Sequence, residues 1–250
     1  MAEPHDALAG QTALVTGAAH RIGRAIALAL AERGVNVVVH CRHSTEAAEE
    51  LADLLRHKGT RAWAVQADLT EPGAVEDLWS QTVRAAGQID ILVNSASIFE
   101  PDTLWDCTAE ALWYNIRLHA WAPLVLARAL AQQAGPAQIV NLLDARLGGY
   151  DPKHVSYQSS KQMLFSLTRM LAVELAPRIR VNAVAPGLIL PPPGRDEAYL
   201  QKLAHTNPLH RHGDTKDVTD AVLYVLGASF VTGQVIYVDG GRHLGKAVHD

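Results

Sequence analysis

Tyr157 and Lys161 stand four positions apart in the sequence, and the side chain of each can donate or accept a proton. On a helix this spacing puts both side chains on one face. A free phenol titrates near pH ~10, so it becomes a useful acid at neutral pH when a neighbouring cation stabilises its anion. Lys161 supplies that cation, and the pair predicts an acid catalyst. The same spacing also occurs on many solvent-exposed helices, so other segments must decide between the two interpretations.

Short apolar runs alternate along the chain with longer segments in which apolar residues recur every three or four positions. The runs predict strands over Thr12–Thr16, Val35–Val39, Ala62–Val65, Ile89–Val93, Gln138–Leu142, Ile179–Val184 and Val235–Val238. Such alternation is typical of a parallel sheet with helices on both faces. We therefore predict an α/β fold: a single-domain, Rossmann-type, doubly wound parallel sheet of about seven strands. Ligands bind such sheets at the carboxyl ends of the strands.

Composition predicts one soluble domain over residues 1–250. The chain is 48% hydrophobic and 19% charged, which suits a large buried core. Its formal net charge of −4 gives no basic surface for nucleic acid or an anionic membrane, so we expect neither partner. We find no leader segment and no long apolar run, and we expect a cytoplasmic protein. The two cysteines, Cys41 and Cys107, are expected to be free thiols, and we expect no metal site.

A glycine-containing turn follows the first predicted strand and leads into a helix. The segment runs from Thr16 to Gly23, with Gly17 at its start and Arg21 and Ile22 before its second glycine. Small residues here let backbone N–H groups and the positive end of the helix approach a pyrophosphate. The strand, turn and helix order favours dinucleotide binding over an ordinary tight turn.

The second predicted strand ends in Arg42, His43 and Ser44. A protein specific for NAD usually has an acid here, bound to the ribose hydroxyls. These three residues instead offer donors to an additional phosphate, which predicts NADPH as the cofactor. The alternative is that Arg42 merely caps a surface loop.

The motifs together resemble the short-chain dehydrogenase/reductase family from about Gln11 to Leu244. The motifs that carry the resemblance are Gly17…Gly23, Asn94, Asn115, Tyr157-x3-Lys161, Pro186-Gly187 and Thr232-Gly233…Asp239-Gly240-Gly241. The resemblance implies that Asn115 holds a water in a proton relay and that Lys161 also binds the nicotinamide ribose. It implies a homotetramer with interfaces around Trp113 and Phe165. It further implies cofactor contacts for Gly17, Arg21, Ile22, Gly23, Asp68, Leu69, Asn94, Ser95, Ala96, Pro186 and Gly187.

Two residues depart from the general pattern of this family. Asp144 stands thirteen positions before Tyr157, where the family usually has a serine. An ionised carboxylate only accepts hydrogen bonds, so it suits a substrate with N–H donors better than a bare ketone. A protonated carboxyl group would instead be able to donate. Arg21 replaces a further glycine and adds a cation near the pyrophosphate and the substrate entrance.

Both departures are similar to the pteridine reductase branch of the family. The segment Asn94-Ser95-Ala96-Ser97-Ile98-Phe99 adds to this likeness, although Ser95 stands where the family usually has asparagine. The resemblance implies that Phe99 stacks on a pterin and that the nicotinamide covers the other face. A packing role in the core or in a lid is the alternative for Phe99. The substrate-binding residues implied in this way are Arg21, Ser97, Phe99, Asp144, Tyr157 and Leu188.

These residues predict the NADPH-dependent reduction of a C=N bond in a pterin. Tyr157 is the expected proton donor, helped by Lys161, Asp144 and Asn115. The segment 188–212 is expected to form a lid that selects the substrate. Two alternatives stay open, a generic carbonyl reductase such as a 3-oxoacyl carrier protein reductase and a non-catalytic regulator that senses NADP.

Overall fold

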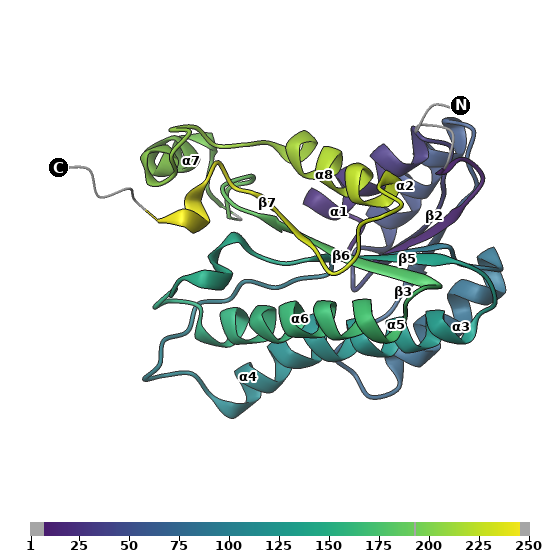
Figure 1. Cartoon of the computed structure of the whole chain (residues 1–250), viewed down its shortest axis with the longest axis horizontal. Coiled ribbons are helices and arrows are strands. Elements are labelled where there is room, and N and C mark those ends of the chain that lie inside the picture. Colours follow the sequence, from purple (N-terminus) through teal and green to yellow (C-terminus); the bar gives the residue numbers. More distant parts are fainter. Residues whose placement is uncertain (1–7, 193, 246–250) are drawn as a thin grey trace.

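The computed structural model describes residues 8–192 and 194–245. Within these residues, strands form one parallel sheet in the order β3-β2-β1-β4-β5-β6-β7 (Figure 1). Their bounds are β1 Thr12–Val15, β2 Asn36–Cys41, β3 Ala62–Gln66, β4 Ile91–Asn94, β5 Ala137–Leu142, β6 Ile179–Pro186 and β7 Val235–Val238. The structure confirms the predicted doubly wound α/β fold of the Rossmann type.

Helices cover both faces of the sheet. One layer holds α1 (Arg21–Ala31), α2 (Thr45–His57) and α8 (Thr215–Gly227), and the other holds α3 (Ala74–Ala86), α5 (Ala122–Gln132) and α6 (Val155–Glu174) (Figure 1). Side chains of a strand alternate between the two layers. In β1, Ala13 and Val15 pack in the first layer and Leu14 packs in the second. All three are fully buried, which explains why this strand reads as a continuous apolar run.

The strand order reverses beside β1. β2 pairs with one edge of β1 and β4 pairs with the other, so the connections that follow β1 and β4 leave the sheet in opposite directions. In doubly wound sheets this reversal leaves a crevice at the carboxyl ends of the strands, where ligands bind. The glycine-containing turn follows β1, and the segment 95–99 follows β4.

A helical bend separates α4 (Ala109–Ile116) from α5. Between them lies a π-helical turn, η2 (Arg117–Trp121). Such turns are rare and frequently occur at functional sites because they change the direction in which side chains point. α4 lies along α6, the helix that carries Tyr157 and Lys161 (Figure 1).

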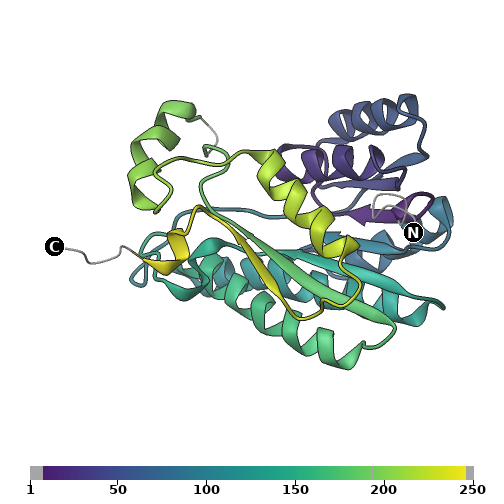
Figure 2. The ribbon, with the colours of Figure 1, turned by 45° about the horizontal axis from the view of Figure 1, so that its top comes forward.

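The segments after β5, β6 and β7 gather at one end of the molecule. They include η3 (Ala145–Gly148), α7 (Glu197–Leu203), η4 (Ala204–Thr206) and η5 (Arg242–Leu244). Two views show α7 and η5 at the same end of the sheet (Figures 1 and 2). The predicted lid, 188–212, includes α7, and its residue 193 lies outside the described residues.

Two further predictions concern the environment of the chain. In the described part of the chain we find no helix with the length and apolar character needed to cross a membrane. Cys41 and Cys107 are both free thiols, as the sequence predicts.

Candidate active site

The turn after β1 requires glycine at two places. Gly17 has a φ of +64°, and a Cβ atom there would lie 2.7 Å from the Cα of Ala96. A Cβ atom on Gly23 would lie 2.3 Å from the carbonyl oxygen of Gly17. Both distances are too short for any side chain, so the turn, the start of α1 and the segment after β4 pack backbone against backbone.

A hollow of about 350 Å³ opens beside this turn. It is lined from three directions, by the turn and α1, by the residues after β2 and by the residues after β4. Among the lining residues are Gly17, Arg21, Ile22, Gly23, Arg42, His43, Ser44, Ser95 and Ser97. The structure thus brings together residues that the sequence analysis assigns to cofactor and substrate.

His40, at the end of β2, fixes the position of the turn. Its Nδ1 accepts the backbone N–H of Gly17 at 3.0 Å, and its Nε2 lies 3.0 Å from the carbonyl oxygen of Ala67. Because Gly17 N–H can only donate, Nδ1 is unprotonated and Nε2 carries the proton. Burial lowers the pKa of His40 to about 4, so the ring is neutral at physiological pH.

The cations at the mouth of the hollow already have protein partners. Arg42 Nε donates to Asp68 Oδ2 at 2.6 Å, and the Arg42 guanidinium lies 5.5 Å from the ring centroid of Tyr114. Arg21 donates to the carbonyl oxygen of Pro191 at 2.9 Å, which links the turn to the predicted lid. Arg42 and Arg21 are both exposed, so a phosphate can reach them.

Other residues assigned to the cofactor or to the substrate lie outside this hollow. Asn94 Nδ2 donates to Asn141 Oδ1 at 2.8 Å, and Leu69 is buried in the core. Pro186 ends β6, and a Cβ atom on Gly187 would lie 2.6 Å from the Cβ of Asp239. Leu188 is buried and lines a second hollow, of about 480 Å³, between the predicted lid and the end of β7.

The predicted catalytic pair is buried on α6. Tyr157 is 9% exposed and Lys161 is 3% exposed. The phenol of Tyr157 donates to Asp144 Oδ2 at 3.1 Å. Lys161 Nζ donates to the carbonyl oxygen of Leu142 at 2.7 Å and lies 5.7 Å from the centroid of the Tyr157 ring. Helix α6 and the loop that follows β5 therefore bring a phenol, its carboxylate partner and a cation to one place.

The electrostatics of the pair differ from the expectation that Lys161 lowers the pKa of Tyr157. Burial raises the pKa of Tyr157 well above 10, and the negative charge of Asp144 raises it further. Burial also lowers the pKa of Lys161 to about 8, an effect that Asp144 opposes. The phenol is therefore protonated but a weaker acid than a free phenol, so the predicted lowering of its pKa by Lys161 is not seen in this structure.

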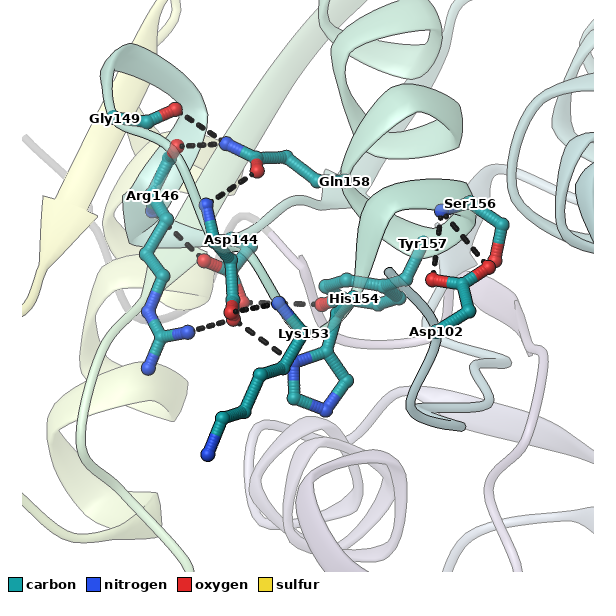
Figure 3. Close-up of polar contacts among 10 residues, drawn as sticks. Asp102, Asp144, Arg146, Gly149, Lys153, His154, Ser156, Tyr157 and Gln158 are labelled. Atoms are coloured by element: carbon teal, nitrogen blue, oxygen red, sulfur yellow. Dashed lines mark hydrogen bonds and ion pairs between the residues drawn. The ribbon is translucent and has the colours of Figure 1, made fainter. Parts of the chain in front are cut away.

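The loop from Asp144 to His154 is held by a polar network (Figure 3). Asp144 Oδ1 accepts the backbone N–H of Arg146 at 2.7 Å and so caps η3. Asp151 is buried, forms an ion pair with Arg146 and lies 2.9 Å from Nδ1 of His154. Gln158 on α6 accepts the N–H of Asp151 at 2.7 Å. These contacts fix the direction of the Asp144 carboxylate.

Phe99 lies beside Tyr157, the predicted proton donor. Its ring meets the Tyr157 ring edge to face, with centroids 4.8 Å apart and planes at 86°. It also stacks on His154, with centroids 3.7 Å apart and planes at 15°. Phe99 nevertheless remains 44% exposed. It is a surface aromatic beside the Tyr157 phenol, not a residue of the hydrophobic core.

The structure places His119, and not Asn115, against the pair. The Asn115 amide donates to Ala111 O and to Ser156 Oγ, both at 3.0 Å, and no hydrogen bond among the described residues joins it to Tyr157 or Lys161. His119 in η2 meets the Tyr157 ring edge to face at 5.3 Å. The predicted water-holding role of Asn115 stays a prediction.

Comparison with known proteins identifies the family of this chain. A family model described as enoyl-(acyl carrier protein) reductase matches residues 17–243. A short-chain type dehydrogenase/reductase of Picea abies is 32% identical and is matched over 94% of this chain and 93% of its own.

The chain belongs to the short-chain dehydrogenase/reductase family. Another relative, the 3-oxoacyl-[acyl-carrier-protein] reductase FabG of Staphylococcus epidermidis, is 32% identical over 94% of this chain and 99% of its own. The crystal structure of FolM alternative dihydrofolate reductase 1 from Brucella canis, complexed with NADP, is also similar. It is 36% identical, covers 96% of this chain and 97% of its own, and has a TM-score of 0.89. The protein is an NADPH-dependent oxidoreductase.

The residues of this reductase fit that cofactor. The close backbone packing at Gly17 and Gly23 leaves room for a pyrophosphate at the start of α1. Arg42, His43 and Ser44 add donors on the same hollow, and no acidic side chain lines it among the described residues. A dinucleotide with an additional phosphate suits this set of donors.

Sequence reasoning missed three residues of this reductase site. His40 and His119 are isolated histidines in apolar segments, and neither belongs to a motif. Arg146 follows Asp144 closely, but only the folded loop brings it to Asp151. The proximity of Arg146 to a predicted site residue was the one available signal.

Proposed function

We propose that the protein reduces a pterin, such as a dihydropterin, dihydrobiopterin or dihydrofolate, at a ring C=N bond. The observation that carries the proposal is the carboxylate of Asp144, hydrogen-bonded to the Tyr157 phenol beside the exposed ring of Phe99. A flat heterocycle with N–H donors complements this combination of an aromatic face and an acceptor.

Asp144 is the main reason to prefer a pterin over a simple ketone. A ketone oxygen needs donors, and reductases of this family usually present a serine hydroxyl next to the tyrosine. Asp144 Oδ1 is already bound to Arg146 N–H, while Oδ2 accepts from Tyr157 and retains a further lone pair. An N–H group or amino group of a pterin is a suitable partner for that lone pair.

The chain's own residues supply the proton and the orientation. Bound NADPH supplies the hydride. Gly17, Arg21 and Arg42 would hold its phosphates, and Lys161 would hold its nicotinamide ribose. Tyr157, whose phenol is protonated, donates its proton to the ring nitrogen next to the reduced carbon as that nitrogen gains electrons from the hydride. Proton donation and hydride transfer together reduce the C=N bond by two electrons.

Phe99 would set the plane of the substrate. The proposal places the pterin between the Phe99 ring and the nicotinamide, with Ser97 and Arg21 at its border and Leu188 of the lid above it. Ser97 and Arg21 line the same hollow as the glycine-containing turn. The stack with His154 holds the Phe99 ring in a fixed orientation.

The relatives favour two substrate classes. The FolM structure, at 36% identity, supports pterin or folate reduction, and the FabG relative supports reduction of a 3-oxoacyl group. A generic carbonyl reductase is therefore the second candidate. Asp144 favours the pterin over the 3-oxoacyl group, because an ionised carboxylate repels the ketone oxygen as that oxygen gains negative charge.

The test is NADPH oxidation with four substrates: dihydrobiopterin, dihydrofolate, dihydromonapterin and an acetoacetyl thioester. We expect turnover of at least one pterin at a kcat/KM well above that of the thioester. Turnover of the thioester alone would refute the proposal and support the second candidate. Tight NADPH binding without any turnover would support a regulator.

We also propose a homotetramer. Trp113, Trp121, Met170 and Val173 are exposed apolar side chains on α4, η2 and α6. Clustered exposed apolar groups on adjacent helices are typical of subunit interfaces. Light scattering should give the mass of four chains, and Val173→Glu should lower it. A monomeric parent protein would contradict this proposal.

A further inference from the structure

His119 lies inside the active site. It is 1% exposed and belongs to the π-helical turn η2, whose altered geometry directs its ring toward α6. The ring meets Tyr157 edge to face, with planes at 89°. A buried polar ring at this position needs hydrogen bonds at both nitrogens. It has them, and their partners reveal its protonation state.

The hydrogen bonds determine which nitrogen carries the proton. Nε2 accepts the backbone N–H of Ile98 at 3.3 Å, and an N–H can only donate, so Nε2 is unprotonated. Nδ1 therefore carries the proton and donates to Ser160 Oγ at 2.8 Å. Ser160 in turn donates to the carbonyl oxygen of Tyr157 at 2.6 Å. The chain of donors runs in one direction from His119 to the backbone of Tyr157.

The ring is neutral as well as oriented. Burial lowers the pKa of His119 well below 6.5, and the positive charge of Lys161 lowers it further. An imidazolium would place a second cation beside Lys161 and would have to give up the N–H of Ile98.

The unprotonated Nε2 of His119 determines the direction of the Ser97 hydroxyl. The Ser97 hydroxyl lies 3.0 Å from Nε2 and 3.2 Å from the carbonyl oxygen of Ile98, and it is exposed to the hollow that holds the glycine-containing turn. Because Nε2 has no proton, the hydrogen of this contact comes from Ser97, and the shorter distance favours Nε2 over the Ile98 carbonyl oxygen as its acceptor. The single lone pair of Nε2 is then shared between Ser97 O–H and the longer contact from Ile98 N–H. The lone pairs of Ser97 Oγ then face away from His119.

We propose that His119 is a positioning residue that takes the hydrogen of Ser97, so that the Ser97 oxygen meets the substrate as an acceptor. Asp144 and Ser97 then form a pair of acceptors beside Tyr157. Such a pair recognises a heterocycle with ring N–H or amino donors and rejects one that offers only carbonyl oxygens. The substrate class deepens the proposed function and rests on it.

The kinetic test uses variants matched in size. His119→Phe keeps the ring packing and removes both nitrogens, while His119→Gln retains an acceptor near the place of Nε2. We expect His119→Phe and Ser97→Ala each to lower kcat/KM for dihydrobiopterin about tenfold, as loss of one hydrogen bond implies. The double variant should lose no more than either single variant, and His119→Gln should recover most of the activity. The KM for NADPH should not change.

A double variant whose kcat/KM is about 100-fold below that of the parent would show that the two losses are independent and would overturn the inference. A kcat/KM for His119→Gln no higher than that for His119→Phe would also overturn it. Thermal unfolding and NADPH binding of each variant verify the fold. Nitrogen-15 NMR of histidine-labelled protein gives a test without substrate, and we expect the Nδ1–H tautomer for His119. An imidazolium or an Nε2–H tautomer would overturn the inference. If no pterin is reduced, the proposed function fails, and the NMR result still decides on His119.

Discussion

Replacing Asp144 with serine restores the residue that is usual in the family. In the structure, Asp144 caps η3 through Arg146 N–H at 2.7 Å and accepts from Tyr157 at 3.1 Å. Serine is itself a good N-cap, so we expect the loop to stay folded. What is lost is the ionised acceptor for the pterin. A hydrogen bond to a charged group contributes about 1.5–3 kcal/mol, which corresponds to a decrease of about 10- to 150-fold in kcat/KM.

The assay follows NADPH oxidation with dihydrobiopterin and with an acetoacetyl thioester, for the parent, Asp144→Ser and Asp144→Asn. Asparagine keeps the shape of the side chain without its charge, so we expect it to fall between the other two with the pterin. The serine hydroxyl can donate to a ketone oxygen, so turnover of the thioester should rise in Asp144→Ser. Parent-level pterin reduction by Asp144→Ser would refute the role of the carboxylate.

Four further predictions follow from the site. Tyr157→Phe should lower kcat by orders of magnitude with NADPH binding intact in a fluorescence titration; unchanged turnover would mean that another group is the acid. Arg42→Asp should raise the KM for NADPH much more than that for NADH, and equal changes in the two constants would argue against a phosphate contact. The pKa of Lys161 is about 8, so kcat/KM should decline as pH rises through about 8 and the cation is lost, whereas a flat pH profile would exclude this role. The pKa of His40 is about 4 in the folded state and near 6.5 in the unfolded state. Between these pH values the unfolded state binds more protons, so the free energy of unfolding should fall by on the order of 3 kcal/mol as the pH drops from 6.5 to 4. The lowered pKa of His119 should also make the folded state less stable at low pH. A thermal unfolding midpoint that is constant from about pH 7 to about pH 4.5 would contradict the lowered pKa of both histidines.

The fold could be predicted because its signals are local. Strands buried on both faces read as apolar runs, as Val37 to Val39 in β2 illustrate, and the spacing of these runs by helix-length segments fixes a parallel sheet. Gly17 and Gly23 could be predicted for a similar reason. Their positions in the turn tolerate no Cβ, so the residue type itself reports the geometry.

The parts that the sequence did not reveal depend on tertiary contacts. Asn115 and His119 stand four positions apart, so helical periodicity places both on one face and does not choose between them. His119 lies in the π-helical turn, and there its ring contacts the ring of Tyr157. The direction of the Tyr157 pKa likewise depends on burial and on the hydrogen bond to Asp144, neither of which can be seen in the spacing of Tyr157 and Lys161.

The central claim is that a pterin ring binds between Phe99 and the nicotinamide with its N–H edge toward Asp144. A crystal structure of the protein with NADPH and methotrexate, a pteridine-based inhibitor, tests it most directly. We predict the pteridine ring parallel to Phe99, with a ring N–H or amino group within hydrogen-bond distance of Asp144. An inhibitor bound elsewhere, or an Asp144 carboxylate directed away from an occupied pocket, would contradict the account.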